Sequence, residues 1–192
     1  MTERRHKKIL SVLHHRQPSL TVVMEDIHDP HNVSAMLRSA DAVGVMEVQL
    51  VYINEKFPKL GKKSSASASK WIQRRKFKTI KECYDALHKE GFCIYATHLG
   101  AKSSSLYNLD LTKKTALVFG NEHRGVSAEA ASLADTNFQI PMTGMIQSLN
   151  VSVACAVTLY EAFRQRLLAG KYVKPRLTQK QLKALFDEWT KK

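Results

Sequence analysis

Several features of other protein classes are missing from this sequence. It has three cysteines, Cys83, Cys93 and Cys155, and no two of them form a C-x-x-C motif. The odd count and wide spacing argue against a disulfide framework, so we expect reduced thiols and a cytoplasmic protein. The basic start, MTERRHKK, is not followed by the apolar stretch of a signal peptide. No run of about 18 apolar residues predicts a membrane span, so no membrane partner is expected.

The common signatures of nucleotide binding and of nucleophilic catalysis are also missing. No G-x-G-x-x-G follows the first β-rich run, and the chain contains neither a P-loop lysine motif nor a G-x-S-x-G elbow. If the protein binds a cofactor, it must use another arrangement of the backbone.

Acidic residues are scarce. The chain has 17 Asp and Glu against 30 Lys and Arg, a net charge of +13. The basic residues gather in three segments, 1–16, 54–81 and 164–192, and the rest of the chain is net acidic. This distribution is typical of a protein that binds a polyanion, although lysines that only confer solubility are an alternative. The residues expected to contact phosphates are Arg4, Arg5, Lys7, Lys8, Lys62, Lys63, Lys70, Arg74, Arg75 and Lys76. Trp71, within the second segment, is more typical of a core aromatic than of a base-stacking one.

The pattern of apolar residues predicts one α/β domain with a doubly wound, mostly parallel sheet, because β-rich runs alternate with helical periods. In the first predicted helix of that domain, apolar residues recur at the helical spacing from Val33 to Ala40, with Asn32 as N-cap and Gly44 as the stop. We expect strands at 21–27, 47–53, 92–99, 115–119 and 138–141, and helices at 3–16, 33–43, 79–89, 127–134, 150–169 and beyond Thr178. The predicted organisation is a basic helical extension (1–18), the sheet domain (19–170) and a C-terminal helical extension (171–192).

Two transitions from strand to loop to helix are the best candidates for a ligand site. GNEHRG (120–125) follows one apolar strand, and IPMTGMIQSLNVS (140–152) leads from another strand into the long helix. Open α/β sheets bind ligands at the carboxyl ends of their strands, and a helix N-terminus offers free N–H groups. Simple capping of the long helix by Ser148 or Asn150 is an equally good interpretation of its start.

A third segment, EDIHDPHN (25–32), combines acids and histidines. Asp26, His28, Asp29 and His31 could ligate a metal and support a metal-dependent nuclease. Turn and capping roles are favoured, because Asp-Pro and Asn are typical of turns and no second ligand group with metal spacing is present. Arg38 by itself is typical of a solvated helical residue.

Three motifs together resemble one family. NVSAMLRSADAVGV, ALVFGNEHRGVS and IPMTGMIQSLNVSVACAVTLYEA resemble the three motifs of the SPOUT-type RNA 2′-O-ribose methyltransferases, in the right order and over nearly the whole chain. The similarity is strongest to the SpoU/TrmH-family enzymes that modify guanosine 18 of tRNA. The short N-terminal helix, in place of an additional RNA-binding domain, favours tRNA over ribosomal RNA.

The resemblance implies a fold, a donor and a site. It implies a C-terminal deep trefoil knot that binds S-adenosylmethionine, and a homodimer with the site at the subunit interface. The residues at the family's catalytic positions are Asn32, Arg38, Glu122, Ser148 and Asn150. Those at its donor-binding positions are Thr97, Gly120, Ile140 and Leu149.

The implied reaction is transfer of a methyl group to a ribose 2′-hydroxyl, without a required metal. Arg38 would serve either as the general base or as a bidentate fork that positions a phosphate; the second role agrees better with the basicity of arginine. The alternatives are 2′-O-methylation of another tRNA nucleotide or of ribosomal RNA, the metal-dependent nuclease, and a non-catalytic RNA-binding protein.

Overall fold

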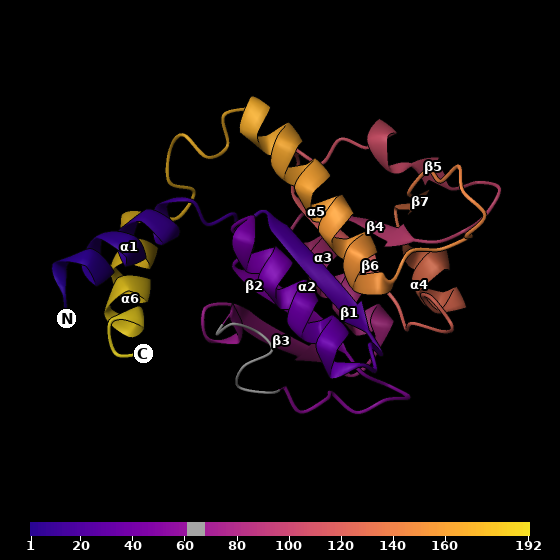
Figure 1. Ribbon diagram of the computed structural model, residues 1–192, viewed down its shortest axis with the longest axis horizontal. Coiled ribbons are helices and arrows are strands. Elements are labelled where there is room, and N and C mark those ends of the chain that lie inside the picture. The colour runs from indigo at the N-terminus through magenta and orange to yellow at the C-terminus, as the bar shows by residue number, and fades with distance from the viewer. Residues whose placement is uncertain (61–67) are drawn as a thin grey trace.

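A twisted parallel sheet with helices on both faces forms the body of the protein in the computed structural model, which describes residues 1–60 and 68–192 (Figure 1). Seven strands follow the order β3-β2-β1-β6-β4-β7-β5, and every pairing between them is parallel. The strands are β1 (Leu20–Glu25), β2 (Glu47–Val51), β3 (Gln73–Phe77), β4 (Cys93–Thr97), β5 (Ser104–Ser105), β6 (Thr115–Phe119) and β7 (Thr136–Gln139). The predicted doubly wound α/β fold is therefore confirmed.

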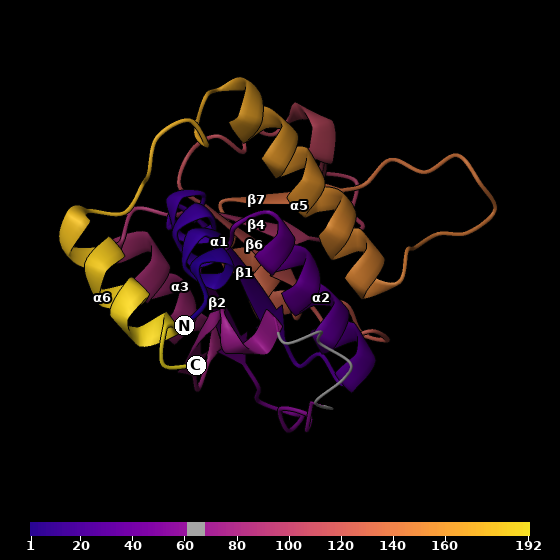
Figure 2. The same ribbon diagram turned by 60° about the vertical axis from the view of Figure 1, so that its left-hand side comes forward.

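Two helices cover each face of the sheet. Helices α2 (Pro30–Ala42) and α5 (Val151–Leu168) lie side by side on one face (Figure 2). Their shared core with the strands includes Val33, Leu37 and Leu159, all fully buried. Helices α3 (Ile80–Lys89) and α4 (Ala128–Leu133) pack on the other face. None of the helices in the described part of the chain has the length and apolar composition of a membrane span.

The two ends of the chain pack against each other beside the sheet. Helix α1 (Glu3–His14) contributes Ile9 and Leu13 to a small core with Leu185 and Trp189 of α6 (Gln179–Trp189). In Figure 1 this helical pair lies at the left, and α4 and the N-terminal end of α5 lie to the right. The two basic extensions therefore form one surface, although the division of the chain into three parts stays a prediction.

The start of α2 differs from the expectation. Asp29, not Asn32, is the N-cap, because its carboxylate accepts from the His31 N–H and Pro30 occupies the first helical position. Asn32 is therefore inside the first turn, where its side chain is free for tertiary contacts. Gly44 ends the helix as predicted: its φ is +85°, and a Cβ there would lie 2.5 Å from the His15 carbonyl oxygen.

Strand β3 was not predicted. Its sequence, QRRKF, has too many charges to indicate a strand by periodicity, and it lies at the edge of the sheet beside β2. Charged side chains are common on edge strands, where they prevent pairing with other chains. Arg74 and Arg75 therefore lie on a strand, in a segment for which the sequence predicted no element. Lys62 and Lys63 lie outside the described residues.

Candidate functional site

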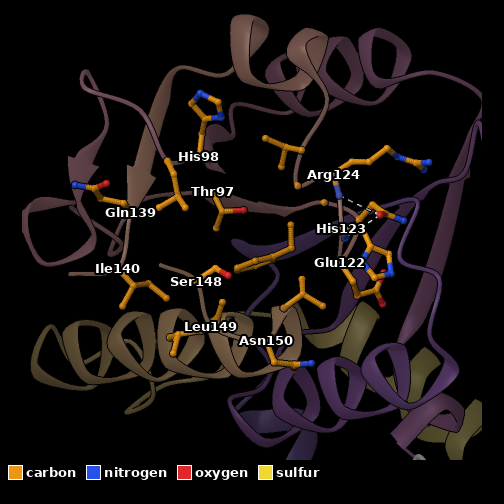
Figure 3. A pocket seen from close by; sticks show the side chains of 18 of the residues that line it. Thr97, His98, Glu122, His123, Arg124, Gln139, Ile140, Ser148, Leu149 and Asn150 are labelled. Atoms are coloured by element: carbon orange, nitrogen blue, oxygen red, sulfur yellow. Dashed lines mark hydrogen bonds between the residues drawn. The ribbon is translucent and has the colours of Figure 1, made fainter. Parts of the chain in front are cut away.

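A cavity of about 570 Å³ opens where β4, β6 and β7 end and α5 begins. Thr97, Gly120, Ile140 and Leu149, the four predicted donor-binding residues, all line it. Figure 3 shows Thr97, Ile140 and Leu149 on one side and Glu122 with Asn150 on the other. These are the carboxyl ends of parallel strands, where a doubly wound sheet is expected to bind its ligand.

The lining of this cavity fits a donor with a purine ring and a charged tail. Leu99, Phe119 and Leu149 supply apolar surface, and the volume lies within the range of about 300–1,000 Å³ that holds ligands of drug size. Among the described residues, no group accepts a hydrogen bond from the main-chain N–H of Ile140 or of Leu149. These groups are available to hydrogen-bond the edge of a heterocycle.

The loop after β6 depends on its glycines. A Cβ on Gly120 would lie 2.1 Å from the carbonyl oxygen of Gly125, so the loop can close only with glycine at this position. The Gly125 N–H donates to the Asn121 carbonyl, and the Asn121 side chain donates to the Asp26 carbonyl. The loop is thereby fixed to the end of β1, with Glu122 directed toward α2.

Three predicted catalytic residues from three distant segments form one hydrogen-bonded chain. The Asn32 Nδ2 donates to Glu122 Oε1 at 2.9 Å, and the Asn150 Nδ2 donates to Asn32 Oδ1 at 3.1 Å. Asn150 Oδ1 accepts from the main-chain N–H groups of Ser152 and Val153, so this residue also caps α5. The Asn150 side chain therefore both caps α5 and belongs to the site, two roles that the sequence left as alternatives.

Glu122 is held as a carboxylate. Burial acts to raise its pKa, but the hydrogen bonds from Asn32 and from the main-chain N–H groups of His28 and Asp29 outweigh it, and the pKa lies below its ordinary value. A carboxylate with three donors is poorly suited to accept a proton. Its geometry fits a residue that fixes the first turn of α2 and the amide of Asn32.

Ser148 lines the cavity, whereas Arg38 does not. Arg38 is exposed on α2, and it makes no ion pair with any residue that the structure describes. It lies six residues after Asn32, which is about 9 Å further along the helix and about 120° around it. Arg38 is therefore the one predicted catalytic residue that, within the described chain, neither lines the cavity nor hydrogen-bonds to a side chain that does.

The segment of acids and histidines has a structural role that the sequence did not reveal. Asp26 has a positive φ of 50°, uncommon outside glycine, and its carboxylate accepts from the main-chain N–H groups of Ile53, Asn54 and Glu55. Among residues 1–60 and 68–192, no group of three His, Cys, Asp or Glu is placed to hold a metal ion. The ligand set proposed for a nuclease is therefore wrong. Asp26 instead directs the chain so that the next amides reach Glu122.

The expected phosphate contacts fall on two surfaces. Arg4, Arg5 and Lys8 are exposed on α1, whereas Lys7 is paired with Glu3 at 2.6 Å. On β3, Arg74 is exposed and unpaired within the described chain, but Arg75 forms an ion pair with Glu90 at 2.6 Å. The two neighbouring arginines point to opposite faces of the strand and are not equivalent.

This difference predicts unequal effects on the salt dependence of RNA binding. Arg74→Ala should reduce the slope of log affinity against log salt by just under one unit, about the value for one phosphate contact, because each contact releases counterions. Arg75→Ala should change the slope less, since Glu90 already neutralises Arg75. Binding measured from low to moderate salt checks both variants. Equal changes of slope would mean that the Arg75–Glu90 pair opens on RNA, and no change in either would place β3 outside the interface.

The comparisons with known proteins agree with this geometry. The SpoU rRNA methylase family model matches residues 19–160. The tRNA (guanosine(18)-2′-O)-methyltransferase of Thermus thermophilus is 46% identical over 191 residues, covering 100% of this chain and 98% of that protein. The TrmH/SpoU tRNA modifying enzyme of A. aeolicus superposes with a TM-score of 0.93 at 38% identity, over 98% of this chain and 96% of that chain. The SpoU methyltransferase AviRb of Streptomyces viridochromogenes, in complex with AdoMet, superposes with a TM-score of 0.71 at 25% identity, over 81% of this chain and 62% of that chain.

The family model spans the strands and the residues that line the cavity, and the match to the A. aeolicus enzyme covers nearly the full chain. They support the doubly wound sheet with a C-terminal trefoil knot that the three motifs predict. Because the family model covers most of the chain and the T. thermophilus relative is 46% identical over the whole of this chain, the chain belongs to the SpoU methylase family.

Proposed function

We propose that this protein transfers a methyl group from S-adenosylmethionine to the ribose 2′-hydroxyl of guanosine 18 in tRNA. The observation that carries the proposal is the joining of Asn32, Glu122 and Asn150 at the mouth of a cavity lined by all four expected donor-binding residues. The 46% identity to the T. thermophilus enzyme of that specificity supports the choice of substrate. A cytoplasmic location is inferred from this substrate.

The residues around the cavity would bind and orient the donor. The apolar side chains of Ile140 and Leu149 would enclose its ring system, and the free main-chain N–H groups of the same residues would bind the ring edge. When bound, the donor supplies a methyl group attached to a positively charged sulfur. Glu122 is already satisfied by its three donors, so it would not compete for that charge.

Arg38 would act on the RNA. As the new O–C bond forms and the C–S bond breaks, the rest of the donor would leave as a neutral thioether and the ribose hydroxyl would release its proton to solvent water. A guanidinium fork matches a phosphate in two parallel hydrogen bonds, so Arg38 would fix the nucleotide and hold its hydroxyl in line with the methyl group. Asn32 and Asn150 would hold the neighbouring segments of chain in place through their shared hydrogen bond.

A second copy of the chain would complete the site. Met145 (99% exposed), Ile146 (62%), Val153 (47%) and Tyr160 (54%) form an apolar surface over α5 and the loop before it. Figure 2 shows this loop between β7 and α5 extending away from the body. Exposed apolar surface of this extent is typical of an interface. The apolar side chains of α2 are buried against α5 in the same chain and add nothing to this surface.

This dimer would place Arg38 of one copy at the donor cavity of the other. Mixing Arg38→Ala subunits with Leu149→Arg subunits, which have a blocked cavity, should restore about a quarter of the wild-type activity, because half of the dimers are mixed and one of their two sites is intact. Each variant alone should be inactive. No recovery from a mixture shown to exchange subunits would place Arg38 and the donor in the same chain, and sedimentation as a monomer at micromolar concentration would contradict the dimer itself.

The position of the methyl group tests the function directly. An unmodified tRNA transcript incubated with the protein and labelled donor should carry one 2′-O-methyl group, at guanosine 18. A transcript with 2′-deoxyguanosine at that position is the matched control and should accept no label. Label at another tRNA position, or only in ribosomal RNA, would favour the alternative substrates, and no label in any RNA would contradict the proposal.

A further inference from the structure

A second recess lies at the other end of the molecule from the donor cavity. It has a volume of about 280 Å³ and lies where α1 meets the short helical turn Ala68–Lys70 and the residue that follows it. Its lining residues are Thr2, Arg4, Arg5, Lys8, Ile9 and Trp71. In Figure 1, α1 is at the left of the molecule, whereas α4 and the start of α5 beside the donor cavity are to the right. The methylated nucleotide therefore cannot occupy both the donor cavity and this recess.

The floor of this recess is aromatic and aliphatic. Trp71 is half-buried, and its ring centroid lies 5.0 Å from that of the buried Trp189. Ile9 is 5% exposed and packs in the same small core. Trp71 thus anchors the core, as the sequence favoured, and still lines the open recess with part of its indole. The volume is slightly below that of pockets for drug-sized ligands, which suits a single heterocyclic base.

The rim of the recess carries positive charges that no acidic side chain of the described chain neutralises. Arg4, Arg5 and Lys8 recur on one side of α1, and none of the three has an acidic partner among the described residues. Lys7, one position away, is by contrast paired with Glu3. Three free cations around an aromatic floor are complementary to a nucleotide, since the base stacks on the ring and the cations neutralise the phosphates.

We propose that this recess binds one unpaired nucleotide of the tRNA, distant from the methylated guanosine, with its base on Trp71 and its flanking phosphates on Arg4, Arg5 and Lys8. The inference rests on tRNA as the substrate in the proposed function, but not on methyl transfer. On this proposal, the packed terminal helices recognise tRNA through a base that its folded shape leaves exposed.

The chain contains two tryptophans, so the fluorescence of Trp71 can be isolated in Trp189→Phe. Adding an unmodified tRNA transcript should quench this emission, because a base stacks on the ring. Vesicles that contain phosphatidylserine, an anionic surface without bases, should leave it unchanged. Binding of tRNA without quenching, or a response to the vesicles alone, would contradict the proposal.

The tRNA affinities of variants distinguish the contribution of base stacking from that of the positive charges. Trp71→Ala should weaken tRNA binding about tenfold, or about 1.4 kcal/mol, with an unchanged salt slope, whereas Arg4→Ala with Arg5→Ala should lower the slope by up to about two units. Trp71→Phe keeps an aromatic face and should bind nearly as the wild type. If Trp71→Phe loses as much affinity as Trp71→Ala, the role of Trp71 is structural and the proposal is wrong. tRNA that quenches Trp71 but receives no methyl group would overturn the proposed function alone.

Discussion

Replacing Arg38 with alanine is expected to lower the rate of methyl transfer by about 10²–10⁴-fold, the usual contribution of a group that acts on proton transfer or positioning in the transition state. Donor affinity should stay near that of the wild type, because Arg38 is proposed to bind an RNA phosphate and the donor-binding residues lie in other segments. Single-turnover rates with saturating tRNA and equilibrium binding of S-adenosylmethionine separate the two effects. Stability should also be unchanged, since Arg38 is exposed and unpaired in the described chain.

Arg38→Lys is the matched control, because it keeps the charge and removes the planar fork. If Arg38 positions a phosphate through two parallel hydrogen bonds, lysine should recover little of the rate. If a positive charge near the phosphate is sufficient, lysine should recover most of it. An Arg38→Ala enzyme with normal turnover and weak donor binding would move Arg38 from the RNA to the donor and contradict the proposed role.

Replacing Arg166 with methionine is expected to lower the free energy of unfolding by about 1–3 kcal/mol, the usual cost of a buried acceptor without a donor. Arg166 is fully buried near the end of α5, and burial lowers its pKa to about 10. Its guanidinium donates to the carbonyl oxygens of Ser19, Leu111 and Lys113. Methionine fills a similar volume but donates nothing. The Leu111 carbonyl would lose its donor, whereas the Ser19 and Lys113 carbonyls would keep their hydrogen bonds from Thr115. The side chain thereby joins the last long helix to the segments that precede β1 and β6.

Urea denaturation at one fixed protein concentration measures this loss, because the apparent stability of a dimer depends on concentration. Arg164→Met is the matched control on the same helix. Arg164 is exposed and pairs with Glu161 within one turn, so its loss should move the midpoint much less. Equal midpoints for Arg166→Met and the wild type would mean that the segments around it are held by the strands alone.

The alternation of strands and helices was predictable because it depends on local patterns. Strand β6 was predicted with its observed bounds, and the start of α3 at Thr79 and the end of α5 at Gly170 followed from capping residues and glycine. The three motifs likewise predicted the family, since their residues are consecutive. The Asp29 cap and the edge strand β3 were missed, because Asn32 is an equally good capping residue by type and because the charged side chains obscured the strand.

The assembly of the site was decided by the tertiary structure. Asn32 and Glu122 lie 90 residues apart, and Asn32 and Asn150 lie 118 apart, so no local pattern could show that they share hydrogen bonds. The sequence by itself determined the family, the excess of positive charge and the order of the elements. Only the fold decided that Glu122 is held by three donors and that Arg38 does not line the cavity of its own chain. The physical reason is that hydrogen bonds and burial depend on distances between segments, which the packing of α2 and α5 on the sheet sets.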